Sequence, residues 1–119
     1  MDSYTKITPK RPAIVMWYQQ WGTHEANRFD PAMVADVYKR GGIPMISWEP
    51  WDPGSKPHNL KNPGDSPEWT LRTIISGKHD AYIISWAKGI KALGGPVMLR
   101  PMHEMNGTWY PWSGTANGN

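Results

Sequence analysis

The stretch AIVMWY, residues 13–18, is a short continuous apolar run of the kind that forms a strand buried on both faces. Two similar runs follow it, IPMISW at residues 43–48 and VMLR at residues 97–100. The segments between these runs, residues 30–40 and 80–93, repeat apolar side chains at helical intervals. The order strand, helix, strand, helix, strand predicts parallel βα units. Such units build either a doubly wound sheet or part of a (β/α)8 barrel.

The ends of the two predicted helices carry recognisable signals. Asp30 is an acceptor at the N-cap position and Pro31 occupies the first helical position. Glycines at 41–42 end that helix, and Asp80 is expected to cap the second helix, which stops at the glycines of 94–95. Residues 49–68 contain five prolines and two glycines, so this segment is expected to be a long functional loop.

The composition excludes several classes of function. The chain has 119 residues, about one domain, and it contains eight tryptophans but no cysteine, which rules out disulfides and cysteine-based sites. The formal charge is +3 and the basic residues are scattered, so no nucleic-acid partner is expected. No apolar run is long enough to cross a membrane, and no signal peptide is evident. The four histidines lack metal-ligand spacing, and no metal or cofactor is expected.

The densest polar cluster, RPMHEMN at residues 100–106, directly follows the third predicted strand. Functional side chains of parallel α/β folds gather at the carboxyl ends of the strands. An ion pair between Arg100 and Glu104 would be a purely structural explanation of this cluster. However, the aromatic run WYPW at residues 109–112 comes immediately afterwards. A carboxylic acid beside exposed aromatic rings suits a site that cleaves sugars, because the acid protonates the glycosidic oxygen while the rings hold the sugar.

The block RPMHEMNGTWYPW, residues 100–112, resembles the acid/base motif of glycoside hydrolase family 26, best known for endo-β-1,4-mannanases. The resemblance extends through GIPMISWEPW, residues 42–51, and SGKHDAYIISWAKGIKALGGPVML, residues 76–99. It implies a (β/α)8 barrel and hydrolysis that retains the anomeric configuration, with two glutamates, an acid/base and a nucleophile. By motif position Glu104 matches the acid/base, and His103 and Trp109 match residues that shape the active centre and contact substrate.

The chain also departs from the family. No glutamate follows Glu104, so the nucleophile is expected to lie outside this chain. The family's acid/base follows the fourth strand, whereas only three strands are predicted before Glu104. The chain is therefore expected to be a barrel fragment with strands two to four and their helices, inactive in isolation. Residues 1–12 are predicted to be a lead-in segment, and residues 13–119 a partial catalytic domain.

The remaining candidate residues lie outside the motif that contains Glu104 or complete the list of predicted substrate-binding residues. Trp48, Glu49 and Trp51 follow the second strand and are expected to line the substrate cleft at the same end of the fold. Trp86 lies on an apolar helix stripe and is expected in the core. The predicted substrate-binding residues are Arg100, His103, Asn106, Trp109, Trp112, Trp48 and Trp51.

Three functions are compatible with these residues. The leading hypothesis is a retaining endo-β-1,4-mannanase acting on β-mannan or a related polysaccharide. A β-1,3-1,4-glucanase or a xylanase of the same family is an alternative within this class. A non-catalytic carbohydrate-binding protein that kept the aromatic residues is an alternative from another class. Because the expected substrates are extracellular polymers, the full-length protein is expected to be secreted.

Overall fold

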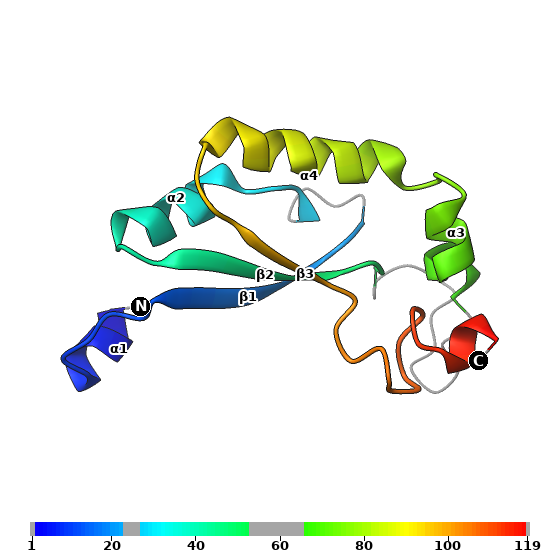
Figure 1. Cartoon of the computed structure of the whole chain (residues 1–119), viewed down its shortest axis with the longest axis horizontal. Helices are drawn as coiled ribbons and strands as arrows, with labels where there is room; N and C mark the ends of the chain where they lie inside the picture. Colours follow the sequence, from blue (N-terminus) through cyan, green and yellow to red (C-terminus); the bar gives the residue numbers. More distant parts are fainter. Residues whose placement is uncertain (1, 23–26, 53–65, 119) are drawn as a thin grey trace.

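The three apolar runs form one parallel sheet in the order β1-β2-β3 (Figure 1), as seen in a computed structural model. The strands are β1 Ile14–Gln20, β2 Ile43–Glu49 and β3 Met98–Pro101. All have the same direction, and their carboxyl ends meet at one edge of the sheet. The α/β class and the parallel arrangement predicted from the sequence are therefore confirmed.

The structure describes residues 2–22, 27–52 and 66–118. Most of the predicted functional loop lies outside these ranges. The helices within them are α1 Asp2–Ile7, α2 Pro31–Lys39, η3 Pro67–Trp69, α3 Leu71–Ile75, α4 Asp80–Leu93 and η4 Thr115–Asn117. None of the helices in these ranges is long and apolar enough to cross a membrane.

The helix-end predictions are correct for α2 and partly wrong for α4. The Asp30 side chain accepts hydrogen bonds from the backbone N–H groups of Ala32 and Met33, as a capping residue does. In α4, by contrast, the cap is His79, and Asp80 is the first helical residue. The His79 carbonyl already accepts a helical hydrogen bond from the N–H of Ile83, at 3.0 Å, so the helix begins one residue earlier than the sequence signal indicated.

The hydrophobic core lies between the sheet and the helices α2 and α4, which cover the same face (Figure 1). Trp86 of α4 is only 2% exposed, which confirms its predicted place in the core. Its ring contacts Trp48 of β2, with centroids 5.3 Å apart, and Phe29 before α2, at 5.2 Å. Large aromatic rings therefore take the place that aliphatic side chains occupy in most cores.

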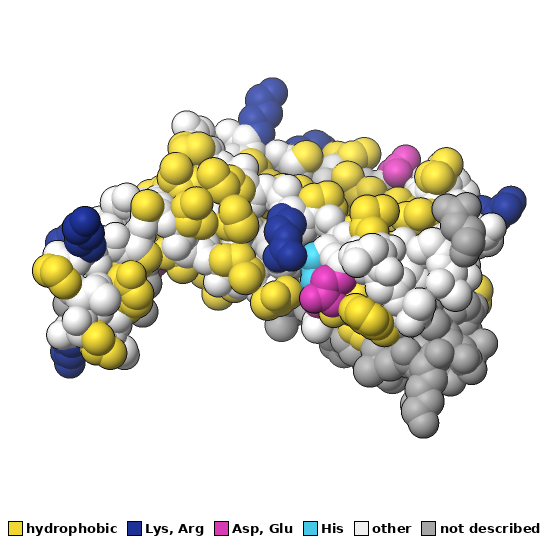
Figure 2. All heavy atoms as spheres, turned by 60° about the horizontal axis from the view of Figure 1, so that its bottom comes forward, with side chains coloured by type: hydrophobic (Ala, Val, Ile, Leu, Met, Phe, Trp, Pro, Cys, Tyr) yellow, Lys and Arg dark blue, Asp and Glu magenta, His cyan; other side chains and the backbone are white. Residues whose placement is uncertain are grey.

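Within the part of the chain that the structure describes, no helix lies over the opposite face of the sheet (Figure 1). Ile14, Met16 and Tyr18 alternate along β1 on this face, and Met16 is 43% exposed. Met98 stands level with Met16 and Met45 across the three strands and is exposed as well. Figure 2 shows hydrophobic side chains gathered over this side of the molecule, with acidic, basic and histidine side chains next to them.

Residues 2–7 form the short helix α1, near the amino-terminal end of β1 and away from the strand ends that carry the polar cluster (Figure 1). Ile7 at the end of α1 is exposed, as is Tyr4. The domain boundary after residue 12 stays a prediction.

Candidate active site

The carboxyl edge of the sheet brings together polar side chains from all three strands. Tyr18, Ser47 and Arg100 stand level with one another in the register of the sheet. The Arg100 guanidinium donates a hydrogen bond to the hydroxyl of Ser47 at 2.8 Å. The structural alternative of an Arg100–Glu104 ion pair is therefore wrong, since Arg100 pairs across the sheet instead.

Glu104 lies in a tight turn directly after β3, and its side chain is exposed. The turn is tied to the sheet because the N–H of Met102 donates to the carbonyl of Trp48, at 3.2 Å. Both Met102 and Glu104 adopt left-handed backbone conformations, with φ of 54° and 55°. This conformation costs an L-residue about 1–2 kcal/mol and is often found where a functional side chain must be aimed.

Trp109 completes the exposed part of the turn. Its indole Nε1–H donates to a carboxylate oxygen of Glu104 at 3.0 Å, although 46% of the residue is exposed. Gly107 makes this possible, because a Cβ at this position would lie 2.6 Å from the Trp109 ring. An acid with a fixed orientation therefore lies next to an accessible flat ring.

His103 is buried directly beneath this turn. Its Nε2 lies 3.0 Å from the Tyr110 hydroxyl and 3.6 Å from a carboxylate oxygen of Glu49. The Tyr18 ring meets the imidazole edge-on, with the ring centroids 5.4 Å apart. The backbone carbonyl of His103 accepts a hydrogen bond from the indole of Trp112 at 2.8 Å.

Tyr110 connects the buried and the exposed parts of the cluster. Its ring stacks on Trp112, with centroids 4.3 Å apart and planes 10° apart. Burial raises the pKa of the Tyr110 phenol, and the negative charges of Glu49 and Glu104 add to the effect, followed by Tyr18. The phenol therefore stays protonated and available as a hydrogen-bond donor around neutral pH.

Four of the predicted substrate-binding residues, His103 and three tryptophans, are buried. Trp112 is 0% exposed, and Trp48 and Trp51 are also buried. Trp48 packs against Trp86 on the helical side of the sheet, while Trp51 meets Trp112 edge-on. The predicted residues with exposed side chains are Arg100, Asn106 and Trp109, together with the acid Glu104.

The sequence prediction did not include Tyr110 and Ser47 among the site residues. For Ser47 a signal existed, because strand alternation places it on the same sheet face as Glu49 and Met45. Tyr110 lies in the aromatic run WYPW that the sequence singled out, but no local signal predicted its contact with His103, since that contact depends on how the turn folds back. Among the described residues, no group of three or more histidine, aspartate or glutamate side chains is placed to hold a metal ion.

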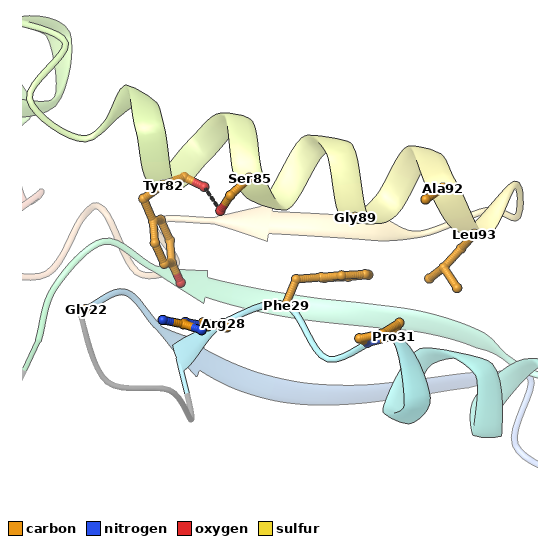
Figure 3. Close-up of a pocket in the computed structure, with 9 residues that line it drawn as sticks. All are labelled: Gly22, Arg28, Phe29, Pro31, Tyr82, Ser85, Gly89, Ala92 and Leu93. Atoms are coloured by element: carbon orange, nitrogen blue, oxygen red, sulfur yellow. Dashed lines mark hydrogen bonds between the residues drawn. The ribbon is translucent and has the colours of Figure 1, made fainter.

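A groove of about 640 Å³ lies elsewhere, between α4 and the segment that precedes α2 (Figure 3). Tyr82 and Leu93 of α4 border it on one side and Phe29 on the other (Figure 3). It contains no residue of the Glu104 turn and lies on the helical side of the sheet. The polar cluster at the strand ends is therefore a separate feature, and it holds the candidate catalytic chemistry.

These features define a class of protein. A parallel α/β sheet with an oriented carboxylic acid beside an exposed indole at its strand ends is an arrangement suited to carbohydrate chemistry. The comparison with known families agrees with the geometry. Residues 2–118 match the model of Glycosyl hydrolase family 26, and the chain belongs to this family.

The relatives are larger polysaccharide-degrading proteins. Endoglucanase H of Acetivibrio thermocellus is 36% identical over 113 residues, which cover 95% of this chain and 11% of the relative. A mannan endo-1,4-beta-mannosidase of Bacillus subtilis strain 168 is 34% identical over 86 residues, which cover 66% of this chain and 24% of the relative. The chain thus spans about a tenth of the length of the endoglucanase and about a quarter of the length of the mannosidase. No solved structure matches the chain.

Proposed function

We propose that this chain carries the acid/base part of a retaining endo-β-1,4-mannanase and that Glu104 is the general acid. The observation that carries the proposal is the turn itself. Glu104 is exposed at the carboxyl edge of the sheet, in a left-handed conformation, and its carboxylate accepts a hydrogen bond from the exposed Trp109. The family membership supports the same reaction class.

In this mechanism Glu104 gives its proton to the glycosidic oxygen as the bond to the leaving sugar breaks. The carboxylate then takes a proton from the water that releases the second sugar. A retaining glycosidase also needs a nucleophilic carboxylate about 5–5.5 Å from the acid. We propose that sequence beyond residues 1–119 supplies this carboxylate, because the part of the mannosidase relative that matches this chain is only 24% of that protein.

The same comparison supports a proposal on architecture. A sheet that is covered by helices on one face and lined by apolar side chains on the other resembles a section of a barrel wall. We propose that β1, β2 and β3 are strands two to four of a (β/α)8 barrel. The uncovered side chains of Met16 and Met98 would then meet those of the other strands inside the barrel.

The buried and exposed residues have different proposed roles. Arg100, Asn106 and Trp109 are proposed to face the substrate, with Trp109 as the stacking platform for a sugar ring. The other four predicted residues are buried, so we revise their role from direct contact to support of the strand ends and of the Glu104 turn; they are His103, Trp48, Trp51 and Trp112.

The relatives leave two candidate polymers. The mannosidase relative favours β-1,4-mannan, and the endoglucanase relative, which covers nearly all of this chain, favours a β-glucan as the alternative. We propose mannan as the principal substrate and a secreted location, because such polymers are found outside cells. Sugar release from mannan, mixed-linkage β-glucan and xylan, measured side by side, separates these substrates. A protein that binds them without hydrolysis would support the non-catalytic alternative.

The test of the acid is Glu104→Gln in the protein as its gene encodes it. The variant should bind mannan normally but turn it over at least about 10²-fold more slowly, because an amide has no proton to give. Aryl glycosides with good leaving groups should lose less activity, since they need little protonation. Asp36→Asn is the matched control, because the exposed Asp36 pairs with Arg40 within α2, away from the turn. Turnover of mannan by Glu104→Gln at the normal rate would remove Glu104 from this role.

A further inference from the structure

Glu49 is a buried carboxylate at the end of β2, and the proposed mechanism gives it no task. The residue is 5% exposed, and strand alternation places its side chain on the uncovered face of the sheet, the face that carries Ser47. Its backbone carbonyl accepts hydrogen bonds from the N–H groups of Trp21 and Trp51, both at 2.8 Å. The position of Glu49 is thus set by the loops that follow both β1 and β2.

The carboxylate of Glu49 faces two ring nitrogens. One oxygen accepts from the indole Nε1 of Trp51 at 3.5 Å, and the other lies 3.6 Å from Nε2 of His103. An ionised carboxylate can only accept hydrogen bonds, and a buried one is costly unless donors surround it. A proton on Nε2 of His103 therefore stabilises this contact, whereas a bare Nε2 would not.

The surroundings of the imidazole point to the same tautomer. Nδ1 of His103 is buried and has no hydrogen-bond partner among the residues that the structure describes. A proton on Nδ1 would be a buried donor without an acceptor, and the bare Nε2 lone pair would then face the carboxylate of Glu49. A proton on Nε2 avoids both costs, and this N–H also lies within reach of the Tyr110 oxygen, at 3.0 Å.

His103 in turn supports the acid. It lies between Met102 and Glu104, the two residues in left-handed conformations, so its side chain anchors the strained part of the turn. Its backbone carbonyl is fixed by Trp112, and its ring contacts Tyr110 with centroids 4.8 Å apart. The packing of this imidazole therefore contributes to holding the backbone next to Glu104 in place.

We propose that Glu49 is a positioning residue, whose carboxylate holds the His103 proton on Nε2 and thereby fixes the turn that presents Glu104. This inference rests on the proposed role of Glu104 as the acid. Glu49 itself does not touch the substrate, and its effect passes through His103. It should therefore affect the rate of the chemical step more than the binding of the polymer.

The kinetic test compares Glu49→Gln, His103→Ala and the double variant in the protein as its gene encodes it. Glutamine keeps the shape, but it offers one oxygen to two donors and turns an NH2 group toward the other. We expect kcat to fall at least about tenfold and KM to change less than about threefold, because small displacements of catalytic groups cost up to roughly 10²-fold. The double variant should be as slow as His103→Ala alone, within about twofold. Asp36→Asn is again the control and should match the unaltered protein.

Three kinetic results would overturn the proposal. One is a normal kcat in Glu49→Gln, and another is a raised KM with a normal kcat, which would make Glu49 a substrate contact. The third is a double variant that loses the product of the two single effects, because Glu49 would then act independently of His103.

A second measurement tests the proposal even if the Glu49→Gln variant does not fold, because it uses the unaltered protein and requires no enzymatic activity. The ¹⁵N spectrum of the unaltered protein reports which ring nitrogen of His103 carries the proton, with the signal assigned by its loss in His103→Gln. We expect a protonated Nε2 and a bare Nδ1, and a proton on Nδ1 alone would refute the inference. If Glu104→Gln hydrolysed mannan at the rate of the unaltered protein, the proposed function would be wrong. The spectrum would still test the contact between Glu49 and His103.

Discussion

Trp109 offers a graded test of how the exposed turn works, because its ring and its N–H group make separate contributions. The N–H donates to Glu104 at 3.0 Å, and the ring is 46% exposed. Trp109→Phe removes the donor and keeps an aromatic face. Trp109→Ala removes both. Comparison of the two variants in the protein as its gene encodes it separates orientation of the acid from stacking on the sugar.

The magnitudes follow from the exposure of the pair. An intramolecular hydrogen bond contributes about 0.5–1.5 kcal/mol net, so we take about 1 kcal/mol for this exposed pair. Trp109→Phe should therefore lower kcat/KM about fivefold. Loss of the ring adds about 0.5–1.5 kcal/mol, so that Trp109→Ala should lose about 2 kcal/mol, or about thirtyfold.

The assay is kcat/KM on mannan oligosaccharides, with the thermal unfolding midpoint measured in parallel. Tyr4→Ala is the matched control, because it removes a similarly exposed aromatic ring from α1, away from the strand ends. The midpoint should hardly change in either Trp109 variant. Equal activity of Trp109→Phe and the unaltered protein would refute the role of the N–H group. A large fall of the unfolding midpoint in Trp109→Ala would show that the ring belongs to the core.

Two further predictions concern stability and assembly. Burial raises the pKa of Tyr82 to about 12, although contacts with Trp48 and Trp86 lower this pKa in part. The folded state therefore keeps the phenol proton that the unfolded state loses above about pH 10. The unfolding midpoint should therefore fall between pH 10 and 12 and fall less steeply in Tyr82→Phe; equal slopes would contradict the assignment. Residues 1–119 produced alone should self-associate or stay molten, and they should release no sugar from mannan, because both sheet edges and the apolar face around Met16 are open. Light scattering, thermal unfolding and a reducing-sugar assay check this, and a monomeric, cooperatively folded and active chain would be evidence against it.

Features that depend on residues near one another along the chain could be predicted from the amino-acid sequence. The apolar runs and the helical spacing between them predicted three parallel strands alternating with helices, because each element's period follows from its own backbone geometry. Asp30 and Pro31 predicted the start of α2 for the same reason. Which face of the sheet the helices cover was left open. Glu104 and Trp109 lie five positions apart, so their meeting in one turn could be expected from the motif alone.

Which aromatic residues are buried, and which polar groups meet, became clear only in the folded chain. Trp48 and Trp112 are residues of the type that stacks on sugars, yet both are buried. Trp48 packs against Trp86 of α4, and Trp112 packs against Tyr110, and the sequence does not show on which side of a strand or turn such a ring lies. Glu49 and His103 are far apart in the sequence and come together only because β2 and β3 are neighbours in register. Such contacts depend on how the segment that connects two parallel strands packs against the sheet. A local pattern of residues does not predict that packing.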